Sequence, residues 1–133
     1  MLGENIGHES GQVTSRRVLS VDGAPSVEIS FAAEGSILGV KHRTLGTYAS
    51  TLRPDGTVLG QGQGIVMGAG GEMATWKGSG VGVFDGSGGA DFRGAIYYHS
   101  SSPAWARLNK VAAVFEYREN ADASTQTQLW EWK

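Results

Sequence analysis

Four polar side chains with acid–base or hydrogen-bonding chemistry lie close together in the second half of the chain. Arg93, Tyr97 and His99 fall on one face of the alternating segment 91–99, and Glu116 lies in the next β-rich segment. If this face points into a folded domain, a buried carboxylate beside Arg or Tyr can orient a ligand or act as a general acid–base. The alternative, which we favour, is an ordinary exposed cross-strand ion pair between Arg93 and Glu116, contributing at most about 1 kcal/mol.

Tryptophans supply the second set of candidate ligand contacts. Trp105 follows three consecutive serines in the one irregular stretch of the chain, which makes it the best candidate for a lid over a binding site. Trp76 is a candidate for contact with a ring-shaped ligand, although a buried tryptophan usually fills a core. Trp130 and Trp132 share one face of the last segment, and we expect them to close the domain or to fill an interface.

Several kinds of chemistry lack their required residues. The chain has no cysteine, and its three histidines, at positions 8, 42 and 99, show no spacing typical of metal ligands, so we expect them on the surface or in loops. No G-x-S-x-G motif is present, and the glycines at 60–64 lack the G-x-G-x-x-G spacing and following helix of a nucleotide site. The sequence therefore predicts no metal site and no cofactor, and it identifies no catalytic residue.

Size and charge set further bounds. A chain of 133 residues fits one domain, 1–133. The net charge of −2 gives no electrostatic basis for binding nucleic acid or an anionic membrane. We find no secretory signal peptide and no membrane-spanning run, and with the lack of cysteine this favours a cytoplasmic location.

Short β-rich runs alternate with turn signals along the whole chain, and helical periodicity is absent. We expect strands at residues 6–20, 26–34, 38–53, 57–66, 72–84, 90–99, 110–118 and 125–133. The first strand is expected to be interrupted near Gly11, Gly35-Ser36 to begin a connection, and the third strand to bend at Gly46. Ser102-Pro103 can start a single helical turn. Eight strands with short turns predict an all-β, closed antiparallel up-and-down barrel with little or no helix; a two-sheet sandwich is the alternative.

Glycine is unusually abundant, at 21 of 133 residues. Alternate glycines at 60–64 and at 78–82 each occupy one face of a strand, and the turn at 69–71 would bring the two strands together. The result would be a patch without side chains. It can relieve crowding in a strongly coiled barrel, or it can leave room for a ligand or for a large aromatic side chain such as Trp76 or Trp130.

The segments GQGQGIV (60–66), GGEM (70–73), GVGVFDGSGG (80–89) and FRGAIYY (92–98) resemble the central strands of the allene oxide cyclase-like barrels. That superfamily includes plant allene oxide cyclases, dirigent proteins and small bacterial barrels of unknown function. The resemblance covers residues 57–117 and implies an eight-stranded, frequently oligomeric barrel with a largely apolar cavity open at one end. It implies no particular catalytic residue, because the functional motifs of the cyclases and dirigent proteins do not align with this chain.

Three functional hypotheses follow. The first is a binding module that holds a small apolar or aromatic ligand, with Arg93, Tyr97, His99, Glu116, Trp105 and Trp76 as candidate contacts. The second is a cyclase- or isomerase-type enzyme acting on a hydrophobic substrate in the same cavity. The third is a solid barrel with a structural role. Apolar residues occur on both faces of segment 110–118, which suggests that its outer face is covered in a dimer or trimer; the alternative is that Ala112 and Val114 are tolerated surface residues.

Overall fold

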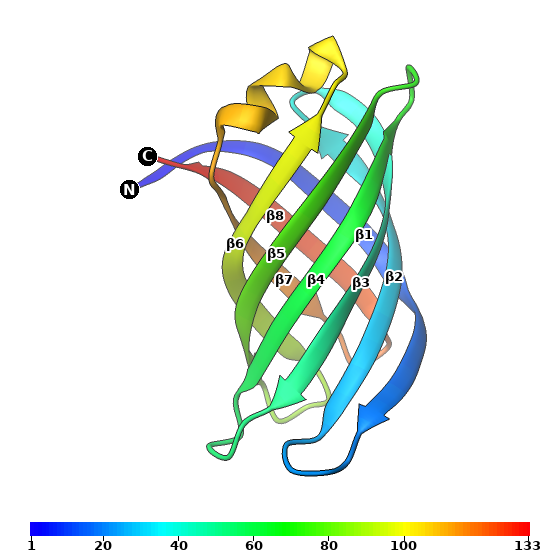
Figure 1. The fold of residues 1–133 in the computed structure, drawn as a ribbon, viewed down its shortest axis with the longest axis vertical. Helices are drawn as coiled ribbons and strands as arrows, with labels where there is room; N and C mark the ends of the chain where they lie inside the picture. Colours follow the sequence, from blue (N-terminus) through cyan, green and yellow to red (C-terminus); the bar gives the residue numbers. More distant parts are fainter.

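The computed structural model describes residues 1–133 and shows eight antiparallel strands closed into one barrel (Figure 1). Each strand pairs with the next, and β8 pairs back with β1. The strands are β1 (Leu2–Ser20), β2 (Ser26–Ile37), β3 (Val40–Leu52), β4 (Val58–Gly68), β5 (Met73–Phe84), β6 (Ala90–Ser100), β7 (Ala113–Glu119) and β8 (Ser124–Trp132). The predicted up-and-down barrel is thus confirmed, and the sandwich alternative is excluded.

The two-residue alternation of the strands separates the barrel interior from its outer surface. On β2, Ile29, Phe31 and Ala33 are buried, whereas the residues between them are half-buried. On β3 the buried residues run from His42 through Thr44 to Tyr48 in the same alternating way. The inward face of these strands is therefore a continuous row of alternate residues, as the pleat of a β-strand requires.

Two of the expected breaks, near Gly11 and at Gly35-Ser36, are wrong, because both glycines allow close packing of neighbouring strands and do not interrupt them. Strand β2 continues through Gly35-Ser36 to Ile37, and the turn follows at Leu38-Gly39, where both residues have positive φ angles of 48° and 78°. Gly35 serves close packing instead, because a Cβ there would overlap the carbonyl oxygen of His8. Gly11 is likewise paired on both sides, and the register shifts of β1 on β2 lie further along, at 13–15 and 18–20.

A short 3-10 helix, η1 (Pro103–Lys110), connects β6 to β7 at one end of the barrel (Figure 1). It is longer than the single expected turn, and Pro103 occupies its first turn, where proline is favoured. Trp105 and Leu108 are its buried residues. The indole Nε1–H of Trp105 donates a hydrogen bond to the Ile37 carbonyl at 3.1 Å. Trp105 therefore covers the barrel end, but as a fixed part of the core and not in a loose segment.

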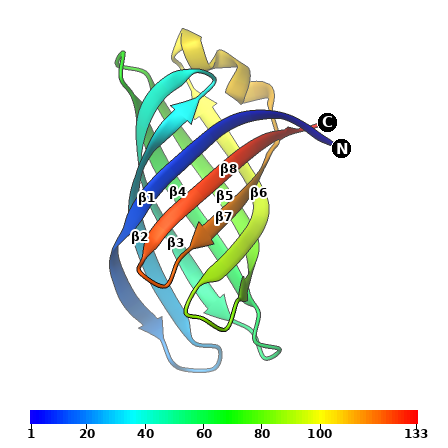
Figure 2. The same cartoon turned by 180° about the vertical axis from the view of Figure 1, so that it is seen from behind.

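The two chain termini lie side by side near this end (Figure 2). Leu2 pairs with Trp132, and the Lys133 N–H donates to the Met1 carbonyl at 2.7 Å. No helix of the structure has the length and apolar character needed to cross a membrane.

The interior side chains form two clusters. The cap cluster, beneath η1, comprises Ile6, Ile37, Val66, Ala74, Ile96, Tyr98, Trp105, Leu108, Ala113 and Leu129. The aromatic cluster, toward the other end, comprises Ile29, Phe31, Ala33, Tyr48, Val58, Ala90, Phe92 and Tyr117. Trp76 and Phe115 pack against both clusters and so mark the level at which the two meet.

Replacing Trp105 tests whether η1 is part of the core. We expect Trp105→Ala to lower the free energy of unfolding by about 3–5 kcal/mol, because it removes a buried aromatic side chain and leaves a cavity. Trp132→Ala is the matched control, since Trp132 is 63% exposed, and we expect it to change stability by less than about 1 kcal/mol. Urea unfolding followed by circular dichroism measures both. Equal effects of the two substitutions would show that η1 is not part of the core.

Candidate functional site

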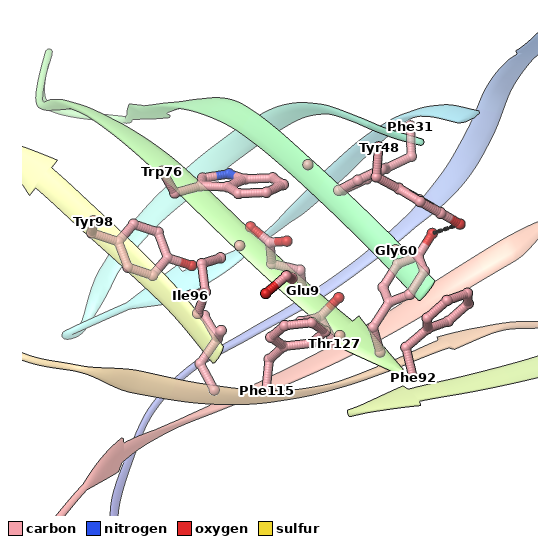
Figure 3. Close-up of a pocket in the computed structure, with 16 residues that line it drawn as sticks. Glu9, Phe31, Tyr48, Gly60, Trp76, Phe92, Ile96, Tyr98, Phe115 and Thr127 are labelled. Carbon is pink, nitrogen blue, oxygen red and sulfur yellow. Dashed lines mark hydrogen bonds between the residues drawn. The ribbon is translucent and has the colours of Figure 1, made fainter. Parts of the chain in front are cut away.

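An unfilled cavity of about 70 Å³ lies inside the barrel (Figure 3). Its lining includes residues from both the cap cluster and the aromatic cluster. The aromatic side chains that line it are Phe31, Tyr48, Trp76, Phe92, Tyr98, Phe115 and Tyr117. Glycines of β4 and β5 form another part of the wall, and Glu9 and Thr127 are polar residues of the lining. The cavity is therefore mostly apolar with few polar groups, which is the usual character of small-molecule sites.

The glycine wall was predicted from the sequence and is confirmed by the strand register. Gly60 lies opposite Gly80, and Gly62 lies opposite Gly78, on the inward faces of β4 and β5. A Cβ at Gly62 would lie 2.7 Å from the Tyr48 Cβ, so this glycine is needed for packing. A Cβ at Gly60 would lie 3.4 Å from the Phe92 ring, which is an ordinary contact.

The same wall accommodates one tryptophan. A Cβ at Gly64 would overlap the indole of Trp76, and a Cβ at Gly46 would lie 2.9 Å from it. Gly46 itself remains paired on both sides of β3. Of the two tryptophans that we considered for this space, Trp76 occupies it. Trp130 does not, since it lies next to the buried Leu129 and therefore on the outer face of β8.

A buried polar cluster lies beside the cavity. His42 Nε2 and Glu9 Oε2 are 2.6 Å apart, and the Thr44 hydroxyl donates to the same carboxylate oxygen. All three side chains are buried, that of His42 completely. The edge of Trp105 packs against the His42 ring at a centroid distance of 6.5 Å, so η1 covers this cluster. The expectation of a surface or loop histidine at position 42 is thus wrong.

Two polar atoms of the residues that line the cavity lack a protein partner. Both donors to Glu9 reach Oε2, which leaves Oε1 unpaired on a side chain that lines the cavity. Tyr98 also lines the cavity and points its hydroxyl group toward Glu9 (Figure 3). Burial, and secondarily the charge of Glu9, raise the pKa of Tyr98 well above its usual value. Its hydroxyl therefore stays protonated at neutral pH and is a hydrogen-bond donor.

At the other side of the cavity, two tyrosines share a weak contact. The hydroxyl groups of Tyr48 and Tyr117 are 3.4 Å apart. Burial raises the pKa of Tyr48 to about 12, and burial together with the neighbouring Tyr48 raises that of Tyr117 further. Beyond them, Glu119 forms an ion pair with Arg16 at 2.6 Å.

The four polar candidates from the second half of the chain do not enter the cavity. Arg93 and Glu116 form an ion pair across β6 and β7 with side chains 72% and 46% exposed, which confirms the alternative that we favoured. Tyr97 is 58% exposed, and His99 is exposed on the same outer face of β6. The face of β6 with Phe92, Ile96 and Tyr98 points inward. The opposite face, which carries the polar candidates, therefore points out of the barrel. Of the predicted contacts, only Trp76 lines the cavity, while Trp105 lies behind His42.

Sequence reasoning missed Glu9, His42 and Tyr98. A usable signal existed for His42, because period-two alternation places it on one face of its strand with Thr44 and Tyr48. No comparable signal existed for Glu9, which is surrounded by polar residues in an almost uniformly polar segment. No group of three or more His, Cys, Asp or Glu side chains is arranged to hold a metal ion.

Comparison with known proteins identifies shared architecture only. No family model and no curated protein matches this sequence. Among solved structures, a protein of unknown function from Clostridium acetobutylicum is 12% identical, with a TM-score of 0.84 over 96% of both chains. A beta-barrel like protein from Acinetobacter baumannii AYE is 14% identical, with a TM-score of 0.83 over 100% of this chain and 96% of that one.

A third structure has a lower similarity. It is an enzyme from Penicillium herquei, 14% identical, with a TM-score of 0.70 over 96% of this chain and 92% of that chain. At these identities the likeness shows the fold, and function must be argued from the site.

The buried tyrosines predict how stability depends on alkaline pH. The pKa of Tyr48 is raised on folding, so its contribution is fully present below pH 10 and is lost as the pH rises toward about 12. We expect the free energy of unfolding, measured with urea, to fall as the pH rises from about 10 to about 12. Tyr48→Phe should make this fall shallower, whereas Tyr97→Phe on the outer surface should leave it unchanged. A fall of the same slope in Tyr48→Phe would contradict this assignment.

Proposed function

We propose that this barrel binds a small apolar or aromatic ligand in its interior cavity, with a hydrogen-bond donor of the ligand on Glu9. The observation that carries the proposal is Oε1 of Glu9, which has no hydrogen-bond partner within the protein and lies in a mostly apolar lining. A hydrogen bond to an ionised carboxylate contributes more free energy than one between neutral groups, so a donor placed at Oε1 would bind favourably. A ligand that donates to Oε1 supplies the missing partner.

The size of the cavity limits the ligand. Its volume of about 70 Å³ is roughly half the ~150 Å³ of an apolar cavity that holds benzene. A ligand smaller than benzene fits beside the aromatic rings as they stand. A ligand of benzene size requires Trp76 or Phe115, the two residues between the clusters, to turn aside.

A matched pair of probes tests the proposal. Phenol and toluene have nearly the same shape, so both require Trp76 or Phe115 to turn aside to the same extent, but only phenol can donate to Glu9. We expect phenol to bind at least about tenfold more tightly than toluene, as a hydrogen bond to a charged group implies. Glu9→Gln should weaken phenol binding and leave toluene binding unchanged. Ligand-observed NMR titrations measure the dissociation constants.

Two control variants locate the binding site. Glu116→Gln changes only the outer ion pair, so we expect both affinities to be unchanged. Gly60→Ala places a methyl group toward the cavity at ordinary contact distance, so both probes should bind more weakly while the fold is retained. Absence of binding to the unmodified protein at millimolar concentrations, or binding unaffected by Gly60→Ala, would overturn the proposal.

A structural role in an oligomer is a second candidate, favoured by apolar side chains on the outer surface. Tyr97 and Trp132 are 58% and 63% exposed, and the outward-facing Val114 of β7 is half-buried. We expect a dimer or trimer, and sedimentation equilibrium of the unmodified chain and of Trp132→Ser measures it. A monomer in both would remove this candidate. Membership of the allene oxide cyclase-like superfamily and a cytoplasmic location are further predictions from the sequence.

A further inference from the structure

Two cavity-lining groups have opposite and complementary hydrogen-bonding roles. Glu9 presents an unpaired carboxylate oxygen, which accepts protons and hydrogen bonds. Tyr98 presents a hydroxyl group that burial keeps protonated and that has no hydrogen-bond partner in the protein. Figure 3 shows the Tyr98 hydroxyl directed toward Glu9, with the Trp76 ring on one side and Phe115 on the other.

We propose that this pair makes the cavity an acid–base site for small carbonyl compounds, in which Glu9 moves a proton between carbons and Tyr98 holds the carbonyl oxygen. The inference rests on the proposed binding function, and it names the substrate class for the same site. A base and an oxyanion donor inside one apolar cavity are the two requirements for enolisation.

The step balances without a co-reactant. Glu9 Oε1 takes a proton from the carbon next to the carbonyl group, and the electron pair of the broken C–H bond forms a carbon–carbon double bond. The π pair of the C=O bond moves to oxygen, where the Tyr98 O–H donates a hydrogen bond to the developing enolate. In a β,γ-unsaturated ketone, return of the same proton to the γ-carbon yields the conjugated α,β-unsaturated ketone and restores the Glu9 carboxylate.

Neighbouring side chains hold the Glu9 carboxylate in one orientation, as a general base requires. His42 and Thr44 both bind Oε2, so they fix the carboxylate and leave Oε1 free for a substrate. His42 Nδ1 is buried without a partner, so the only hydrogen bond of this imidazole is the one to Glu9. We assign His42 as a positioning residue. The mostly apolar lining lowers the local dielectric constant, which strengthens the interaction of a developing enolate with Tyr98.

The volume of the cavity narrows the substrate class to small ketones. About 70 Å³ leaves room for few atoms beyond a carbonyl group and its neighbours unless Trp76 moves. Cyclopentenone in its β,γ-unsaturated form is a suitable probe, because it is cyclic and about the size of benzene, so it requires no larger movement of Trp76 or Phe115 than benzene does. Its conjugated isomer absorbs in the ultraviolet. Conversion is followed directly as the increase in absorbance.

The experiment compares four forms of the full chain. We expect the unmodified protein to isomerise the probe, Glu9→Gln to slow the reaction by about 100-fold, and Tyr98→Phe to slow it by at least about tenfold. Glu116→Gln, on the outer surface, should leave the rate unchanged. Circular dichroism and toluene binding confirm that each variant is folded with its cavity intact.

The outcomes separate this inference from the proposed function. Toluene and phenol binding without any isomerisation by the unmodified protein would overturn the acid–base role and leave ligand binding in place. An equal rate in Glu9→Gln would also overturn it, because the base would then lie elsewhere. Failure of toluene, phenol and the ketone to bind would overturn both proposals.

Discussion

The interior of this protein depends on one steric constraint, the fit between a wall of glycines and a set of aromatic rings inside a closed barrel. Eight strands enclose a space just wide enough for side chains or one small ligand. Where β4 and β5 carry glycines on their inward faces, the rings of Trp76, Phe92 and Phe115 approach the backbone. Because flat rings do not fill this space completely, a small cavity remains between the two interior clusters.

Burying the polar cluster costs desolvation free energy, and hydrogen bonds within the protein offset this cost at only one of the two Glu9 oxygens. His42 and Thr44 bind one oxygen of Glu9, and η1 with Trp105 covers the histidine from the barrel end. An apolar set of similar volume would satisfy packing at no desolvation cost. Oε1 of Glu9 has no hydrogen-bond partner within the protein, and a ligand bound in the cavity, as we propose, would supply one.

The similar solved structures share the barrel architecture but few residues with this chain. Barrels with 11–14% identity to this chain superpose over nearly its whole length, so the architecture tolerates almost complete replacement of the sequence. The shared fold therefore does not determine what such a barrel binds, which depends on its side chains. In this chain, the inward-facing side chains with chemical potential are Glu9, His42 and Tyr98.

The sequence by itself determined the number of strands, the up-and-down order and the shared face of the glycines at 60–64 and 78–82. These features depend on local turn chemistry and on the two-residue period, both of which can be read from neighbouring residues. Only the tertiary structure decided which face of each strand points inward. Alternation separates Arg93 from Phe92 on β6 but does not say which of them meets the interior. The contact between Glu9 and His42 likewise joins residues 33 positions apart on β1 and β3, two strands that pair with β2 and not with each other. The register places both residues opposite Gly35 of β2, and because Gly35 has no side chain, the two side chains can meet across it inside the curved sheet.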